Sequence, residues 1–553
     1  MTKSIFSLLF ALFVGQWLLA QETFPVNGVH DKKPIYYAFT NAHIYKSATE
    51  FVENGTLLIK EGKVVSAGAG IQIPAGAVIQ NCEGLFIYPS FIDAYAGFNQ
   101  SSKKEKKEMV PHSHWNPSLH PEFQYNAEFP LKDKLKEDWL ASGFGLANIH
   151  HRDGIMRGYG QLIHIGIDQP NTALLSTKSA AHYSFARGTS DVAYPTSHIG
   201  AVALLRQSFY DADWYMGHTS ITKENTPAFD EINKQASAKC IFELTNPLTL
   251  RNVIGLEQEF DRKFIVKGTG EEYLLDPIQV AGRSMIVPIS FPKPYDVSDP
   301  YEARMLSLAQ LKHWEAAPFN AYFLDQQGVR IALSRDTIGS SKEFLKNLKQ
   351  VTESGFDHQK ALASLTSIPA EMLGVNQQAG DLNTGKLANF FISNKRFDEA
   401  GFIIAQHWNK GQKVLDKRLP DQNLTGDYNL VIGDQNFRLT ISELSEKGVK
   451  ASVKYKTSTD KLKVKVKLDN ELVSVVLMTG DSASKLLYQL SGKQSLGGTV
   501  WDGKGQDNVG SWVTWAALRD RKSDDGNSRQ RDTTKRVVNA PNIMLPNMAY
   551  GYH

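Results

Sequence analysis

The stretch YPSFIDAYAG, residues 88–97, decides the fold of this chain. A second stretch, GVRIALSRD (residues 328–336), follows about 240 residues later and ends on Asp336. Near the end of the first stretch stand Tyr95 and Gly97, and neither can replace an imidazole as a ligand of a divalent metal ion. The first stretch therefore offers no nitrogen ligand at these two positions.

These stretches resemble the first and last barrel strands of the amidohydrolase superfamily. The first strand of that family is usually written P-G-F-I-D-A-H-x-H, and its two histidines correspond to Tyr95 and Gly97 here. The family aspartate of the last strand corresponds to Asp336. The resemblance covers roughly residues 36–417 and implies an α/β fold, a (β/α)8 TIM-like barrel with a composite β-sandwich.

With 553 residues the chain is too long for one hydrophobic core, and about three domains are expected. Residues 21–88 form the next segment, and its part from residue 36 onward reads as short strands between glycine turns. Together with residues 386–418 they resemble the composite β-sandwich of the amidohydrolase family. Residues 89–385 alternate strand-like and helix-like runs, as a (β/α) barrel requires, with helices predicted after Ser340 and Asp357.

The remainder of the chain has a different pattern. Residues 420–515 contain uninterrupted alternation, for example KLKVKVKL at 461–468, which predicts an additional C-terminal all-β, sandwich-like domain. Residues 516–553 read as a polar linker and an apolar tail. In exported tandem amidohydrolases that the chain resembles, a similar tail leads into a second barrel that carries the histidines.

Residues 1–20 have the pattern of a signal peptide. Lys3 supplies the positive charge, residues 5–19 the apolar region, and Leu18-Leu19-Ala20 a small-residue exit. The apolar run is too short for a good membrane-spanning helix, and no later stretch reaches that length. We therefore expect an exported protein, periplasmic or secreted, without a membrane span.

Composition excludes several classes of protein. Hydrophobic residues make up 42% and charged residues 22% of the chain, as in ordinary globular proteins. A net charge of +3 implies neither a nucleic-acid partner nor an anionic membrane surface. Cys82 and Cys240 lie in apolar, strand-like contexts, which predicts two buried free thiols.

The resemblance implies a metal clamp at the carboxyl ends of the barrel strands. The metal lowers the pKa of a water molecule, and the last-strand aspartate acts as general base, so Asp336 is the candidate catalytic residue. Glu243 stands where the strand-five histidine is expected, and Lys267 stands at the strand-six place. These substitutions predict a barrel that has lost its metal ligands.

Other histidines offer an alternative. His150 and His151 end the strand-like run GFGLANIHH, and because adjacent strand residues face opposite sides, only one can point into the barrel mouth. Asp336, Glu243 and one of these two could form a rebuilt metal site. His112 and His114 have HxH spacing, with His120 nearby, but the flanking prolines favour a surface loop, and a stray metal site there is the alternative.

Three functional hypotheses follow. The first is a hydrolase-like barrel, nominally for amide or other C–N bonds, that is catalytically degenerate and packs with a second amidohydrolase barrel, either a separate chain or a lost C-terminal half. The second is an active hydrolase with the rebuilt site. The third is a binding module that holds a peptide or glycan without turnover. No cofactor is expected, and a divalent metal such as zinc is expected only for the rebuilt site.

Overall fold

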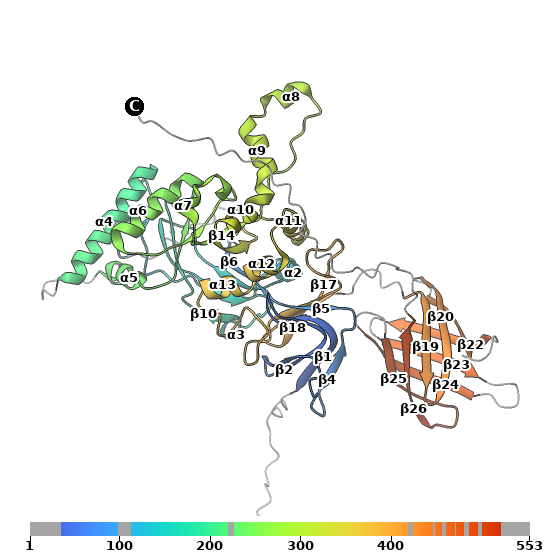
Figure 1. Cartoon of the computed structure of the whole chain (residues 1–553). Coiled ribbons are helices and arrows are strands. Elements are labelled where there is room, and N and C mark those ends of the chain that lie inside the picture. The colour runs from blue at the N-terminus through green and yellow to red at the C-terminus, as the bar shows by residue number, and fades with distance from the viewer. Residues whose placement is uncertain are drawn as a thin grey trace, which may run out of the picture. The chain divides into compact units, whose positions relative to one another are not determined.

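The computed structural model describes residues 35–97, 112–218, 226–417, 424–445, 448–455, 461–469, 472–479, 486–495 and 500–520 (Figure 1). The predicted signal peptide, and the linker and tail from residue 521 onward, lie outside these residues. Within the described part, no helix is long and apolar enough to cross a membrane. Cys82 and Cys240 are both buried and free, as predicted.

An eight-stranded sheet joins the beginning of the described chain to the segment that follows the parallel strands. Its strands run in the order β18-β17-β16-β5-β1-β2-β3, with β4 paired to β1. Glu61 and Gly62, both with positive φ, make the tight turn predicted between two of these strands. The bounds are β1 (Tyr36–Tyr45), β2 (Phe51–Lys60), β3 (Lys63–Gly68), β4 (Val78–Asn81), β5 (Phe86–Pro89), β16 (Phe390–Ser393), β17 (Ile404–Asn409) and β18 (Gln412–Asp416).

Parallel strands form the central part of the fold. β6 pairs parallel to β7, and β11 to β15 pair parallel in sequence order. The strands are β6 (Phe91–Ala96), β7 (Phe144–Ile149), β11 (Ala181–Ser184), β12 (Cys240–Glu243), β13 (Ile265–Lys267), β14 (Ser284–Pro288) and β15 (Arg330–Ser334).

The predicted (β/α)8 barrel is only partly present in this region. The strands lie in two mixed sheets, β10-β9-β7-β6 and β15-β14-β13-β12-β11-β8. β8 (Met156–Tyr159) and β9 (Gln161–His164) run antiparallel to their neighbours, and β10 (Leu174–Ser176) continues the first sheet. The connection from β7 to β8 is too short for a helical crossover, which a parallel strand pair requires, so the chain reverses direction there.

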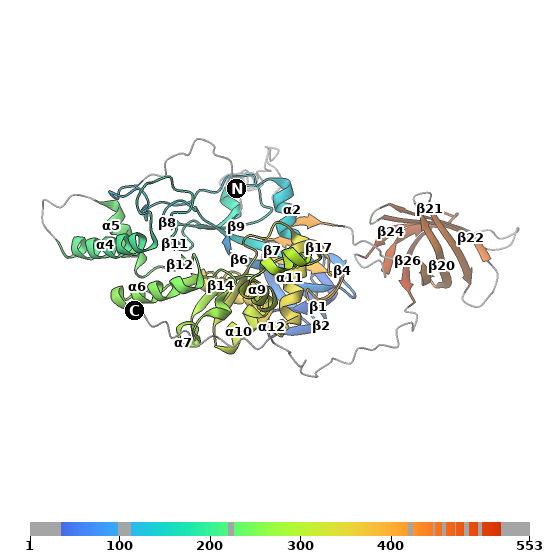
Figure 2. The same ribbon diagram turned by 90° about the horizontal axis from the view of Figure 1, so that it is seen from above.

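Helices follow most of the parallel strands (Figure 2). The predicted helix starts are confirmed, since the Ser340 and Asp357 side chains accept hydrogen bonds from the first-turn backbone of α11 and α12. The bounds are α2 (Asp133–Ala141), α3 (Pro170–Ala173), α4 (His198–Gly217), α5 (Pro227–Gln235), α6 (Leu250–Phe260), α7 (Pro277–Val280), α8 (Pro300–Met305), α9 (Leu308–Ala316), α10 (Asn320–Gln326), α11 (Ser341–Glu353), α12 (His358–Leu365) and α13 (Ser367–Met372).

The Asp93 carboxylate connects the first parallel strand to the last. Its Oδ1 accepts hydrogen bonds from the Tyr95 N–H at 2.9 Å and the Ser334 hydroxyl at 2.8 Å. Its Oδ2 accepts from the Arg335 N–H at 3.0 Å. Burial raises the pKa of Asp93 to about 6, although these three donors favour the ionised form. This side chain therefore joins the edges of the two sheets at the ends of β6 and β15.

The C-terminal domain is a closed antiparallel barrel, where the sequence predicted a sandwich. Each strand pairs with its neighbour in sequence, and β19 pairs with β26, so no edge remains. Trp501 and Trp515 lie in its core. Alternation alone could not distinguish the two architectures, because both bury one face of every strand. The strands are β19 (Gly426–Ile432), β20 (Gln435–Ser445), β21 (Gly448–Tyr455), β22 (Lys461–Asp469), β23 (Leu472–Thr479), β24 (Leu486–Gln494), β25 (Val500–Gln506) and β26 (Trp512–Arg519).

We expect Asp93→Asn to lower the free energy of unfolding by about 1–3 kcal/mol, because at least one buried N–H or O–H loses its acceptor. Calorimetry of the full chain measures the change. Asp133→Asn, at a side chain that is 97% exposed, is the matched control and should stay within about 0.5 kcal/mol of the wild type. Equal effects of the two substitutions would show that Asp93 does not join the sheets.

Candidate functional site

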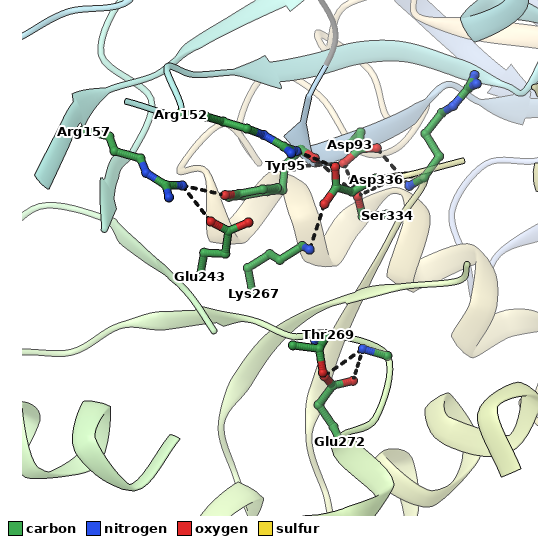
Figure 3. A network of polar contacts seen from close by, with 12 residues as sticks. Asp93, Tyr95, Arg152, Arg157, Glu243, Lys267, Thr269, Glu272, Ser334 and Asp336 are labelled. Atoms are coloured by element: carbon green, nitrogen blue, oxygen red, sulfur yellow. Dashed lines mark hydrogen bonds and ion pairs between the residues drawn. The ribbon is translucent and has the colours of Figure 1, made fainter. Parts of the chain in front are cut away.

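A network of charged side chains lies at the carboxyl ends of the parallel strands (Figure 3). Tyr95 comes from β6, Glu243 from β12 and Lys267 from β13, while Asp336 follows β15. We call this region the barrel mouth. The strand ends thus bring together Tyr95, Glu243, Lys267 and Asp336, four residues that the sequence placed there.

Both carboxylate oxygens of Asp336 are paired with cations. The Arg152 Nη2 lies 2.6 Å from Oδ1, and the Lys267 Nζ lies 2.8 Å from Oδ2. The Asp336 side chain is 4% exposed and that of Lys267 is 8% exposed, so the pairs are largely removed from water. Two positive charges therefore surround the carboxylate that the resemblance assigned as general base.

Arg152 fills space that a side chain at position 97 would need. It comes from the loop after β7, and a Cβ placed on Gly97 would lie 2.4 Å from its Nη2 and 3.2 Å from the Asp336 Oδ1. A histidine at position 97 is therefore incompatible with the observed guanidinium. The glycine at the second histidine position therefore leaves the space that the Arg152 guanidinium occupies.

Tyr95 stands at the first histidine position and is fully buried. Its hydroxyl accepts a hydrogen bond from the Arg157 Nη1 at 3.2 Å, and the Lys267 Nζ lies 5.2 Å from its ring centroid. Burial raises the pKa of Tyr95 well above its usual value, so the phenol is neutral at physiological pH. Tyr95 acts here as an aromatic wall and a hydrogen-bond acceptor.

Glu243 and Arg157 form the third ion pair of the mouth. The Arg157 Nη1 lies 2.7 Å from its Oε2, and the Arg157 side chain is only 1% exposed. Burial by itself raises the pKa of Glu243, but the charges of Arg157 and Lys267 outweigh it and hold this pKa at about 2. Glu243 is therefore ionised throughout the physiological range.

The side chains of the two histidines after β7 lie in different places, as the strand alternation predicted. His150 lies in the mouth, stacked on His182 with ring centroids 3.8 Å apart and 4.2 Å from the Tyr95 ring centroid. Burial lowers the pKa of His150 well below its usual value and that of His182 to about 3, so both rings are neutral. His151 instead contacts the Phe123 ring, away from this stack.

Sequence reasoning missed Arg152 and Arg157. Their type gave no signal, because arginines are common in surface loops and their acidic partners are more than 80 residues away in the chain. Their position in the sequence was a weak indication, since both arginines follow the candidate residues His150 and His151. His112 and His114 lie in a segment without helix or strand, apart from the bridge residues Leu119 and Gln124, as their flanking prolines predicted. The predicted surface position is wrong for His114, which is buried.

A divalent metal, which the family pattern implies, does not fit the residues of the mouth. Tyr95 is a neutral phenol, Gly97 has no side chain, and Asp336 already contacts two cations. Among the described residues, Asp336, Glu243 and His150 do not form a group with metal-ligating separations. One such group does exist elsewhere: His120, His151 and Asp153 each offer a ligand atom within 4.8 Å of the others.

Comparison with known proteins identifies the fold. Neither protein-family models nor curated protein sequences gave a match. Among solved structures, an amidohydrolase from Thermotoga maritima MSB8 aligns with 69% of this chain and 100% of its own, at 17% identity and a TM-score of 0.54. The fold is that of an amidohydrolase.

Two further solved structures are similar at lower TM-scores. A β-aspartyl dipeptidase from Fervidobacterium islandicum AW-1 aligns with 70% of this chain and 98% of its own, at 12% identity and a TM-score of 0.37. A putative prolidase from Bifidobacterium longum aligns with 68% and 94%, at 12% identity and a TM-score of 0.37. The amidohydrolase fold rests on the first structure, which confirms the predicted resemblance, whereas a complete (β/α)8 barrel is not confirmed.

We expect Glu243→Gln to lower the free energy of unfolding at pH 7 by about 3 kcal/mol, because it leaves Arg157 buried without its counter-ion. The pKa of Glu243 is lower in the folded chain than its ordinary value of 4.5, so its contribution is present above pH 4.5 and disappears as the pH falls toward 2. Denaturation curves of both proteins between these pH values measure the difference. Glu353→Gln, in an exposed pair with Lys349, is the control and should show little change at any pH.

Gly97→Ala should displace the Arg152 guanidinium and destabilise the chain by about 1–2 kcal/mol. Gly255 in α6 is the matched control: its Cβ would have open space, and alanine there should stabilise the helix by about 0.5–1 kcal/mol. Thermal unfolding compares the two variants. A neutral Gly97→Ala would show that Arg152 does not need this space.

Proposed function

We propose that this chain is an exported, non-hydrolytic member of the amidohydrolase fold. The observation that carries the proposal is the pairing of both Asp336 oxygens, one with Arg152 and one with Lys267. In a metal-dependent hydrolase the metal activates the water and the carboxylate removes its proton. Here two side-chain cations supply the positive charge, and neither leaves a coordination site for water.

The remaining groups of the mouth do not restore a general base. Glu243 is paired with Arg157, and the phenol of Tyr95 is neutral. His150 has its pKa lowered by burial and is stacked between other rings. The rebuilt hydrolase site of Asp336, Glu243 and a histidine is therefore the weaker proposal, because each carboxylate has a cationic partner and His151 lies elsewhere.

A binding role is the second candidate, favoured by the charged side chains of the mouth. Three cations, Arg152, Arg157 and Lys267, are paired with two carboxylates, Asp336 and Glu243, while the nearby Asp93 carboxylate is bound by N–H and O–H donors. The Arg152 side chain is 29% exposed, so it can reach a ligand from solvent. We propose that the mouth binds a carboxylate-bearing, peptide-like ligand. Alternatively, this chain is a scaffold whose partner is a second amidohydrolase barrel that carries the histidines.

The direct test is an amide-hydrolysis screen of the full mature chain, residues 21–553, with and without added Zn²⁺ or Mn²⁺. Substrates would be N-acetylated amino acids, dipeptides and cyclic amides. We expect no turnover above the buffer rate, because the mouth holds no activated water. Thermal shift in the same plates reports ligands that bind without being hydrolysed.

Asp336→Asn is the control variant for this screen. Metal-dependent turnover by the wild type that disappears in Asp336→Asn would refute the proposal and identify Asp336 as a general base. If that variant fails to fold because two cations lose their partner, Arg152→Met serves instead. It keeps the Lys267–Asp336 pair and, on our proposal, should remain inactive.

A further inference from the structure

His120, His151 and Asp153 form a three-residue group that the proposed function does not use. His120 lies in the segment that precedes α2, and the other two lie in the loop between β7 and β8. One ligand-capable atom of each residue lies within 4.8 Å of those of the other two. His120 is fully buried, and the other two are partly buried.

The hydrogen bonds in the group hold the rings in place without using all their nitrogen atoms. The His120 Nε2 donates to the Asp153 carbonyl oxygen at 2.7 Å, and the Asp153 N–H donates to the His151 Nδ1 at 3.1 Å. The buried His120 Nδ1 has no hydrogen bond of normal geometry to a described residue. A buried nitrogen without such a bond is uncommon and calls for an explanation.

Two imidazoles and one carboxylate are a common ligand set for zinc. Zinc lies about 2.0–2.1 Å from each ligand, which sets tetrahedral ligand atoms roughly 3.3 Å apart. The ligand atoms now lie within 4.8 Å of one another, and rotation of the three side chains can bring them to this separation. The present hydrogen bonds would then be exchanged for bonds to the metal. Three protein ligands leave the fourth position for water.

We propose that His120, His151 and Asp153 bind a zinc-like divalent cation outside the barrel mouth. The group shares no residue with the positions where the family pattern places its metal, namely Tyr95, Gly97 and Asp336. It joins the segment before α2 to the loop between β7 and β8.

The loop after β7 couples this group to the mouth through alternation of its side chains. His150 and Arg152 belong to the mouth, whereas His151 and Asp153 face the zinc group. A cation on both His151 and Asp153 would therefore fix the backbone on either side of Arg152. On the proposed function, it would hold the guanidinium against Asp336 without taking part in chemistry.

The test uses ZnCl2 alone as the probe and the full mature chain, stripped of metal with chelator and dialysed. We expect one equivalent of zinc by titration calorimetry and elemental analysis. His120→Ala, His151→Ala and Asp153→Asn should each weaken binding at least tenfold. His112→Ala, from the neighbouring HxH loop, should bind as the wild type does, and Asp336→Asn should still bind one equivalent of zinc.

Two results would overturn the inference: no stoichiometric zinc in the wild type, or binding that survives in the three ligand variants. Binding lost in Asp336→Asn but kept in His120→Ala would place the metal in the mouth. If a variant misfolds, Co²⁺ added to the wild type gives a second readout, since tetrahedral nitrogen and oxygen ligation produces visible absorption. Hydrolysis by the wild type would refute the proposed function and would not contradict the zinc site. Absence of zinc binding would refute the zinc site and would not contradict the proposed function.

Discussion

The pairing of buried charge determines the arrangement of the barrel mouth. Moving a charged group out of water costs several kcal/mol, so each buried ion needs a partner at hydrogen-bond distance. Asp336 has Arg152 and Lys267, and Glu243 has Arg157. These pairs connect the ends of β12, β13 and β15 to the segment after β7. Losing one partner leaves the other buried and uncompensated, so the network holds its loops as a unit.

The first strand carries both a side chain that joins the two sheets and side chains that line the mouth. Asp93, on β6, still accepts the hydrogen bonds that join β6 to β15. Tyr95, on the same strand, is a buried neutral phenol, and Gly97 leaves room for Arg152. In barrels of this type the side chains that stabilise the core and those that carry chemistry are different residues. Selection on one set can therefore relax while the other set remains.

The segment from His150 to Asp153 serves two neighbouring sites with alternate residues. Extended backbone sends successive side chains to opposite sides. His150 and Arg152 complete the charged mouth, and His151 and Asp153 meet His120 on the other side. A change at either site therefore acts on the same short stretch of backbone. This geometry relates the zinc group to the mouth although the two share no residue.

The sequence by itself determined the amidohydrolase fold, the residues Tyr95 and Gly97 at the strand-one histidine positions and the helix starts at Ser340 and Asp357, because these depend on local patterns along the chain. It did not predict that the parallel strands lie in two mixed sheets instead of a complete (β/α)8 barrel. It predicted the all-β character of the C-terminal domain but could not distinguish a sandwich from the closed barrel, since closure depends on β19 meeting β26. Only the tertiary structure decided that Arg152 and Arg157 pair with Asp336 and Glu243, and that His120 lies beside His151. Those contacts join residues distant in sequence, and a single chain gives no signal for which distant charges meet.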